Sequence, residues 1–385
     1  MVSALNYLFY DDSPVFGGHE VMTLLGVEAL LAEPDVRVHF LASTSNAALI
    51  GKLEALSARY GGLHLHPISQ RSSKLEALRN RLKPSRIREL AEQLRPFAPD
   101  LVIAVQGNIE HSSLALLAAA QAGLKAVSYI PVPHSNAEMG AKLGALRDLF
   151  TAPLFRTPSA FITITDEMGA MLRQRGATCP IRIVYNGVDT TRYQPRPKDA
   201  ARAALGLPDG RRLIGTVGRL EFRQKQQHLL VDAVKSSPTL AAACHLVFAG
   251  DGPDAGNLRD RVKEAGLEAN VTILPWSDTA GLYPALDALV IPSRYEGLPL
   301  VMLEALACGT AVLGSNRDGM KDVLPEAWRF QPDSVNALAA TLDRFLKEGA
   351  PPPPSDLVTR VRTTMSLTAF SDGFRSALRE LAGGD

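Results

Sequence analysis

The most constraining feature of this sequence is an alternation of short strands and helices that runs through the chain twice. Apolar runs typical of buried strands recur along the chain, and helical periodicity follows most of them. The segment Arg192 to Gly210 is rich in Pro, Arg and Asp, which predicts a linker region between the two series. Such alternation favours parallel sheets with helices on both faces. Over 385 residues it predicts two α/β domains rather than one.

The expected strands can be placed from the apolar runs. They begin at Leu5, Val36, Leu63, Leu101, Ala126, Ala160 and Ile181 in the first series, and at Leu213, His245, Val271, Ala288 and Ala311 in the second. The C-terminal segment Leu357 to Leu381 predicts helix with a break near Ser366. We expect its last part to pack back on the first domain.

Composition and charge exclude several classes of protein. A hydrophobic fraction of 46%, a charged fraction of 21% and a net charge of +1 describe an ordinary globular chain that binds no nucleic acid. No apolar run reaches the length of about 18 residues needed to span a membrane. The three cysteines lie far apart without a Cys-x-x-Cys pair, so we expect neither a disulfide framework nor a zinc site. With no signal-like N-terminus, we expect a cytoplasmic location.

The most informative stretch for function runs from Pro292 to Gly309. It follows the apolar run Ala288 to Ile291, turns sharply, and continues as a helix of good helix formers over Leu300 to Cys308. Gly309 is typical of a residue just past a helix C-terminus. The stretch therefore predicts a strand, a tight turn and a helix, with one glutamate on the turn and a second inside the helix.

This geometry suits a nucleotide diphosphate sugar. The first N–H groups of a helix lack partners within it and lie at the positive end of its dipole, so they can hold a phosphate. Glu296 would accept hydrogen bonds from sugar hydroxyls beside that phosphate. Glu304 lies roughly 12 Å further along the helix axis, where it would reach a ribose. The alternative is a plain surface helix that carries two glutamates.

Two other predicted loops at strand ends carry suitable groups. Arg219 and Lys225 follow a strand, and two cations there would neutralise a diphosphate, unless they are ordinary solvated loop charges. Gly17 and Gly18 follow the first strand, where they let the backbone approach a ligand closely or simply form a turn.

His134 and Trp276 each allow two interpretations. His134 follows a strand, at the edge where open α/β sheets bind ligands, but a lone histidine is as often structural. Trp276 would either stack on a nucleobase or pack between domains. The glycines at 250, 252 and 256 are spaced too loosely for a dinucleotide loop, so we expect no NAD and no other cofactor.

A basic run lies in the first half of the chain. A solvated helix face is one interpretation, and a docking patch for anionic lipid or a phosphate-bearing acceptor is the other. The cations of the run are Arg71, Lys74, Arg79, Arg81, Lys83, Arg86 and Arg88, against Glu76 alone. The second interpretation predicts peripheral contact with the inner face of a membrane.

Several of these motifs occur together in one order: Gly17-Gly18, Asn186-Gly-Val-Asp189, Gly218-Arg219 with Lys225, Gly250-Asp-Gly-Pro253 and Glu296-x7-Glu304. In this order they resemble the retaining glycosyltransferases of family 4, which have the GT-B fold. The resemblance is strongest over 183–324. It implies two Rossmann-like domains facing across a cleft, with domain bounds that we place at 1–185 and 186–364, and a C-terminal helix, 365–385, on the first domain.

The resemblance also implies roles for single residues. Glu296 would hold the hydroxyls of the transferred sugar, Glu304 the ribose, and Arg219 with Lys225 the diphosphate. Gly17 and Gly18 would close over the donor, and His134 would touch the transferred sugar. The donor-binding set is completed by Trp276, Gly297, Leu298, Pro299 and Leu300. The sequence departs from the family pattern at Gln226, where glycine often follows the lysine, and at Pro299, which replaces a frequent glycine.

The implied reaction moves a hexose from a UDP- or GDP-sugar to a hydroxyl of a saccharide or lipid-linked acceptor, with retention. The chain has no Asp-x-Asp triplet to ligate a diphosphate-bridging metal, so we expect metal-independent transfer. The transferred proton would go to the leaving phosphate, and no protein base is assigned. A nucleotide-sugar epimerase, a phosphorylase of the same fold and a non-catalytic nucleotide-sugar binding module are the alternatives.

Overall fold

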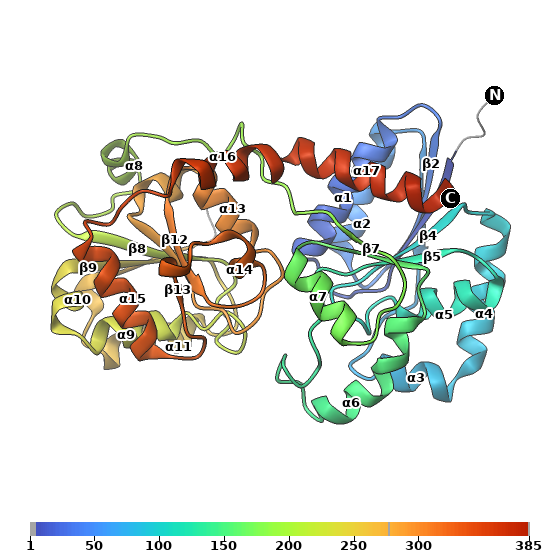
Figure 1. The fold of residues 1–385 in the computed structure, drawn as a ribbon, viewed down its shortest axis with the longest axis horizontal. Helices are drawn as coiled ribbons and strands as arrows, with labels where there is room; N and C mark the ends of the chain where they lie inside the picture. The colour runs from blue at the N-terminus through green and yellow to red at the C-terminus, as the bar shows by residue number, and fades with distance from the viewer. Residues whose placement is uncertain (1–4, 276–277, 384–385) are drawn as a thin grey trace. The chain divides into compact units, whose positions relative to one another are not determined.

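The structure is a computed structural model that describes residues 5–275 and 278–383. The chain divides into two compact units. Unit 1 comprises the chain up to Asn186 together with residues from Thr368 onward, and unit 2 runs from Gly187 to Leu367. Each unit contains one sheet flanked by helices (Figure 1). Among the described residues, no helix has both the length and the apolar character needed to cross a membrane.

The sheet of unit 1 has seven parallel strands in the order β3-β2-β1-β4-β5-β6-β7. All of them arise from the predicted apolar runs. Their bounds are β1 Leu5–Asp11, β2 Val36–Ser43, β3 Leu63–Ile68, β4 Leu101–Val105, β5 Ala126–Tyr129, β6 Ala160–Thr163 and β7 Ile181–Ile183. The strand order reverses between β1 and β4, which is where sheets of this type bind ligands at their carboxyl edge.

Helices cover both faces of this sheet. They are α1 Gly18–Leu31, α2 Ala47–Arg59, α3 Glu76–Leu82, α4 Pro84–Leu94, α5 Ser113–Ala122, α6 Gly144–Thr151, α7 Asp166–Gln174 and α17 Leu367–Gly383. Leu8 and Tyr10 of β1 belong to the core that packs under α4 and α5. The alternation of side chains along a strand sends Tyr7 and Phe9 to the other face, and both are fully buried.

Helix α17 returns the chain to unit 1, where its Phe374 is fully buried. A Cβ on Gly26 of α1 would lie 2.6 Å from the Phe374 ring, so glycine lets α17 lie close to α1. The same ring meets the edge of Tyr129 with centroids 5.5 Å apart. Arg182 pairs with Glu380 at the surface. The break before α17 was predicted near Ser366, and α16, Ser355–Thr364, ends just before that residue.

The sheet of unit 2 has six parallel strands in the order β10-β9-β8-β11-β12-β13. Their bounds are β8 Arg212–Val217, β9 Cys244–Ala249, β10 Val271–Leu274, β11 Ala288–Ile291, β12 Ala311–Ser315 and β13 Arg329–Phe330. The two-residue β13 was not predicted, because so short a strand has no periodicity of its own.

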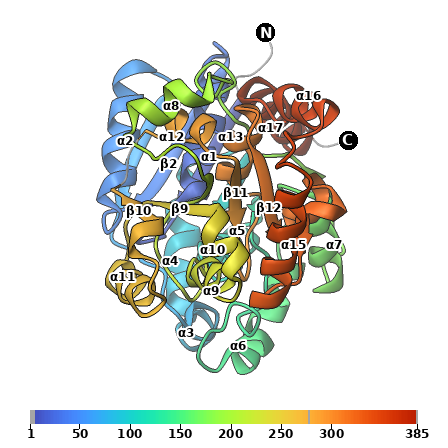
Figure 2. The same cartoon turned by 90° about the vertical axis from the view of Figure 1, so that its left-hand side faces the viewer.

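The helices of unit 2 again lie on both faces of its sheet. In addition to α16 they are α8 Lys198–Ala204, α9 His228–Lys235, α10 Pro238–Ala243, α11 Ala255–Glu264, α12 Thr279–Leu282, α13 Leu300–Ala307, α14 Gly319–Val323 and α15 Val335–Lys347. Helices α9 and α15 pack against each other and share one apolar core with β8, β9, β11 and β12 (Figure 2).

The segment Arg192 to Gly210 was predicted to be a linker region. This prediction was wrong for residues 198–204, which form α8. The helix is fixed by Asp287, which precedes β11 and is buried. Asp287 accepts hydrogen bonds from Arg202 at 2.7 Å, from Lys198 at 2.8 Å and from the N–H of Leu213 at 2.8 Å. Lys198 and Arg202 of the segment therefore neutralise a buried carboxylate, which composition alone does not reveal.

Candidate functional site

Two loops meet at the carboxyl edge of the second sheet. Strands β8 and β11 are adjacent and parallel, with Ile214 opposite Ala288, so the loops that follow them leave from the same edge. The N–H of Arg294 donates to the carbonyl of Gln224 at 2.7 Å, which joins the two loops directly. The loop that carries Arg219 and Lys225 therefore lies against the loop that carries Glu296.

Lys225 and Glu296 are in direct contact. The Lys225 Nζ lies 2.6 Å from Glu296 Oε1, and the exposed fractions of the two side chains are 28% and 8%. The N–H of Glu296 donates to Asp318 Oδ2 at 2.8 Å, which holds the backbone of the turn. Asp318 itself has a φ of 53° and precedes α14. Two residues that are 71 positions apart, both predicted to bind the same ligand, thus come together.

Arg219 lies on the same loop but keeps its charge accessible. Its side chain is 59% exposed, and its Nε lies 3.6 Å from Glu221 Oε2, a loose surface pair. The backbone of Arg219 is held instead, because Gln227 Nε2 donates to its carbonyl at 2.8 Å. Because its backbone is fixed and its guanidinium is solvated, Arg219 is well placed to bind an anion.

Helix α13 starts immediately after the turn. Pro299 is its N-cap, with a φ of −61°, and has no N–H to offer. The predicted phosphate donors near the helix start are therefore the N–H groups of Leu298 and Leu300, not that of residue 299. The helix ends one residue earlier than predicted, and Gly309 follows it with a φ of 77°, the left-handed conformation expected of a residue past a C-cap.

Glu304 of α13 lies among tyrosines. Tyr283 donates to Glu304 Oε2 at 2.6 Å, and the ring of Tyr193 lies 6.0 Å from that of Tyr283. Burial raises the pKa of Glu304, while hydrogen bonds from Tyr283 and Tyr193 oppose that rise. Neither tyrosine was predicted from the sequence, because both are distant from Glu304 along the chain.

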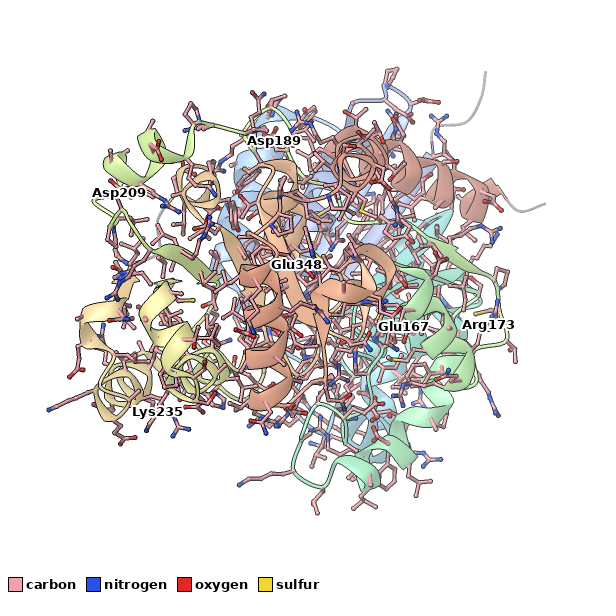
Figure 3. All side chains as sticks on the ribbon, turned by 60° about the vertical axis from the view of Figure 1, so that its left-hand side comes forward. Glu167, Arg173, Asp189, Asp209, Lys235 and Glu348 are labelled. Atoms are coloured by element: carbon pink, nitrogen blue, oxygen red, sulfur yellow. The ribbon has the colours of Figure 1, made fainter. Side chains whose placement is uncertain are left out.

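The Asn186-Gly-Val-Asp189 motif explains the position of Tyr193. Asp189, labelled in Figure 3, accepts hydrogen bonds from the N–H groups of Thr191 at 2.9 Å and Arg192 at 3.1 Å. The N–H of Tyr193 then donates to the carbonyl of Asp189 at 2.9 Å. The aspartate thus shapes the turn that brings Tyr193 to Glu304.

Close packing explains why glycine is needed at two positions in the loop after β9. A Cβ on Gly250 would lie 2.1 Å from the carbonyl oxygen of Gly218, and one on Gly252 would lie 2.3 Å from that of Leu220. Gly250 also has a φ of 142°. These glycines let the loop after β9 pack on the start of the loop that carries Arg219, so close packing explains why glycine is needed here.

In unit 1, the glycine pair begins α1. The N–H of Gly17 donates to Glu20 Oε2 at 2.7 Å, and His19 Nε2 lies 2.9 Å from Glu20 Oε1. Burial favours the neutral form of Glu20, but hydrogen bonding and charge from His19 outweigh it and lower the pKa of Glu20. Asp11, His19 and Glu20 each offer one atom that could ligate a metal ion, and these three atoms lie within 4.8 Å of one another.

His134 also belongs to unit 1 and is buried, with 1% of its surface exposed. It borders a small cavity of about 170 Å³ that is also lined by Ser135, Asp148 and Arg175. Trp276, predicted beside the nucleobase, lies outside the described residues. The structure thus groups Arg219, Lys225, Glu296 and the start of α13 at one edge of unit 2.

Two known sequence families match the chain. The family described as glycosyl transferases group 1 matches residues 197–363, and the one described as glycosyltransferase family 4 matches residues 16–192. The chain belongs to the group 1, family 4 glycosyltransferases. The two matches meet a few residues after the boundary between the units, and together they include every predicted site residue.

Two curated relatives are both named D-inositol 3-phosphate glycosyltransferase. The protein of Rhodococcus erythropolis is 36% identical over 169 residues, which cover 40% of this chain and 38% of the relative. That of Rhodococcus opacus is 35% identical over 167 residues, which cover 40% and 37%. The matched region of this chain thus spans well under half the length of either relative.

Solved structures share the fold over almost the whole chain. Anabaena HepE, solved in complex with UDP and glucose, has a TM-score of 0.73 at 18% identity and covers 97% of this chain and 99% of its own. Sucrose-phosphate synthase from Thermosynechococcus elongatus has a TM-score of 0.76 at 20% identity, with coverage of 99% and 100%. Both likenesses establish that this family member has the GT-B fold that the sequence predicted.

Proposed function

We propose that this protein transfers a hexose from a nucleotide diphosphate sugar to an acceptor hydroxyl, with retention at the anomeric carbon. The observation that carries the proposal is the contact between Lys225 and Glu296 beside the start of α13. A cation, a carboxylate and the N-terminal end of a helix at one sheet edge match a diphosphate next to a sugar. Arg219, on the same loop, supplies the second cation.

The donor is proposed to be a UDP-sugar. HepE, which shares the fold, has been solved with UDP and with UDP-glucose, and this favours UDP over GDP. Glu304 would accept hydrogen bonds from the ribose hydroxyls, with Tyr283 and Tyr193 holding its carboxylate in place. Gly17, Gly18 and His134, in unit 1, stay predicted donor contacts, as does Trp276.

In the proposed reaction, charge grows on the leaving diphosphate as the glycosidic bond breaks. Arg219, Lys225 and the N–H groups of Leu298 and Leu300 would stabilise that charge, and each such preorganised contact is worth about 3 kcal/mol. The acceptor hydroxyl would attack from the same face and pass its proton to the leaving phosphate. Glu296 then positions the sugar hydroxyls and forms no covalent bond. Because these groups can neutralise the diphosphate, transfer should persist in excess chelator.

The proposal can be tested by screening UDP- and GDP-hexoses for thermal stabilisation and for slow hydrolysis. A true donor raises the midpoint of unfolding, because it binds only the folded chain. It should also release free nucleotide over time. If no nucleotide sugar stabilises the chain or is turned over, the proposal is wrong.

The screen also separates the alternatives. An epimerase would convert one nucleotide sugar into another without an acceptor, and a binding module would be stabilised but release nothing. A phosphorylase would require a lysine-bound pyridoxal group, which is visible by its absorbance. Lys225, Glu296 and Arg219 are all present at one edge of the unit 2 sheet, and this favours an active transferase over a binding module.

Peripheral contact with an anionic membrane is a second part of the proposal. Arg81, Lys83 and Arg88 of the basic run are exposed. Exposed leucines lie on and beside α3 and α6, which pack together: Leu75, Leu82, Leu143, Leu146 and Leu149. Apolar side chains mixed with cations are typical of surfaces that lie on anionic lipid. Binding to phosphatidylglycerol vesicles, and its loss in Leu82→Ser/Leu149→Ser, would test this contact.

A further inference from the structure

A cavity of unit 1 lies at the carboxyl edge of its sheet and has a volume of about 770 Å³. Its walls come from the loops after β1, β3 and β4, including Pro14, the segment 69–74 and Asn108, and from helices α3, α4 and α6. The strand order reverses between β1 and β4, and open α/β sheets bind ligands at such a point. The cavity is large enough for a ligand of sugar size.

The charge of this cavity is strongly positive. Its lining contains five cationic side chains, Arg71, Lys74, Arg79, Arg86 and Arg147, and a single carboxylate, Glu110. Serine hydroxyls at 69, 72 and 73 and the side chain of Asn108 add neutral hydrogen-bonding groups. Burial lowers the pKa of His111, also in the lining, to about 4, so this imidazole is neutral near pH 7.

Buried carboxylates hold three of the five cations. Glu76 is fully buried and pairs with Arg86 at 2.7 Å and with Arg79 at 3.4 Å. Glu110 is 2% exposed and pairs with Arg147. Two carboxylates do not neutralise five cations. A surplus of positive charge therefore faces the cavity, and an anionic ligand would neutralise it.

The excess positive charge of the cavity is on Arg71 and Lys74. Within the part of the chain that the structure describes, neither makes an ion pair with a carboxylate. The carbonyl of Arg71 accepts from Arg79 Nη1 at 3.2 Å, which ties this segment to the arginines held by Glu76. Preorganised arginines beside two unpaired cations form a site that favours a compact, doubly charged anion.

We propose that this cavity binds a phosphate monoester on the acceptor, so that the acceptor is a phosphorylated sugar or polyol. This inference rests on the proposed transferase function, because it assigns the second substrate of that reaction. A phosphate monoester presents about two negative charges and three acceptor oxygens. These match the guanidinium forks of Arg79 and Arg86 and the ammonium of Lys74.

The basic run therefore divides into two groups with different roles. Arg71, Lys74, Arg79 and Arg86 line the cavity, whereas Arg81, Lys83 and Arg88 do not. This division supplies a matched pair of variants, Arg71→Ala/Lys74→Ala and Arg81→Ala/Lys83→Ala. Each removes two exposed cations from the same stretch, so both change net charge equally and neither removes a partner of Glu76.

The experiment is calorimetric titration of the full chain with D-inositol 3-phosphate and glucose 6-phosphate, each compared with its unphosphorylated parent. At least one phosphorylated compound should bind about tenfold or more tightly than its parent. The cavity variant should lose about ten- to a hundredfold in that affinity, since two charge-assisted contacts are removed. The surface variant should bind within about twofold of the wild type. Arg79→Gln, which removes the charge but keeps a polar side chain, should also weaken binding.

Several outcomes would overturn the inference. The neutral parents could bind as tightly as the phosphorylated compounds, or the two double variants could lose affinity equally. Saturating UDP could displace the phosphorylated compound, or neither a phosphorylated compound nor inorganic phosphate could bind. UDP affinity should be unchanged in both double variants, so loss of the acceptor site is distinguished from failure of the proposed function. If the acceptor phosphate belongs to a lipid, only vesicles containing phosphatidylinositol phosphate should compete.

Discussion

Lys225 Nζ lies 2.6 Å from Glu296 Oε1, and this contact joins the loops after β8 and β11. Both side chains are largely shielded from water, so each holds the other in position before any ligand arrives. In the proposed reaction the pair must open toward the donor, with Lys225 on the phosphate and Glu296 on the sugar. Their energetic coupling is therefore a direct measure of how the site is preorganised.

Replacement of one member of this pair should affect turnover as much as replacement of both. We expect Lys225→Met and Glu296→Gln each to lower kcat/KM for the nucleotide sugar by about two decades, because both act on the same transition state. The double variant should fall by much less than four decades, since contacting residues are not additive. A strictly additive double variant would show that the two side chains act independently. Steady-state transfer assays of the three variants provide the measurement.

Arg219→Ala should lower kcat by about two decades or more while the fold stays intact, because the guanidinium would stabilise the leaving diphosphate. Its 59% exposed side chain makes only a loose pair, so unfolding should be nearly unchanged. Arg211→Ala is the matched control, since Arg211 is also exposed but precedes β8 at the opposite edge of the sheet. Wild-type transfer by Arg219→Ala, or an equal loss in Arg211→Ala, would remove Arg219 from the proposed site.

Tyr283→Phe should weaken UDP binding by about tenfold and leave kcat less affected. The variant removes the hydrogen bond that holds the Glu304 carboxylate, and the loss from a hydrogen bond to a charged group is about 1.5 to 3 kcal/mol. Because Tyr283 opposes the effect of burial, its removal should also raise the pKa of Glu304 further. Titration with UDP across pH measures both effects. An unchanged affinity would argue against contact between Glu304 and the ribose.

The stability of the chain should fall on acidification because of a histidine cluster on β2 and β3. His39 Nδ1 lies 3.1 Å from His66 Nε2, and the His39 ring stacks on His64. Burial, followed by the charges of His66, His64 and Arg37, lowers the pKa of His39 to about 4 from its ordinary 6.5. The unfolded chain therefore binds more protons between these values, so the free energy of unfolding decreases as pH falls from about 6.5 toward 4.

Urea unfolding at pH 7.5 and pH 5 checks this dependence. His39→Gln removes the group with the lowered pKa, so the variant should lose less stability between the two pH values than the wild type. The effect should be partial, because His39 is only partly buried and solvent screens its charge. An identical loss in the wild type and His39→Gln would show that other groups govern the acid sensitivity.

Much of this fold could be predicted from the sequence, because strands buried on both faces are continuous apolar runs. What could not be predicted depends on contacts between distant residues. The buried pair of Arg202 and Asp287, which turns an apparent linker into α8, joins residues 85 positions apart. The Glu304 partner Tyr283 had no local signal, and neither did the cavity, whose lining comes from three loops and three helices. Residue types at strand ends indicate chemistry, but only the fold decides which of them meet.

Gln226 provides a prediction in which backbone and side chain have opposite effects. It stands where glycine often occurs in the family, and its φ is 52°, a left-handed conformation that costs a non-glycine residue about 1 to 2 kcal/mol. Its side chain offsets that cost, since Nε2 donates to Asp333 Oδ1 at 2.6 Å. Gln226→Gly and Gln226→Ala both lose this bond, but only the alanine keeps the strained Cβ. The glycine variant should therefore be more stable than the alanine variant by about 1 kcal/mol, the reverse of the usual order. Chemical denaturation of the two variants measures the difference, and an alanine variant of equal or greater stability would show that the left-handed backbone carries no cost here.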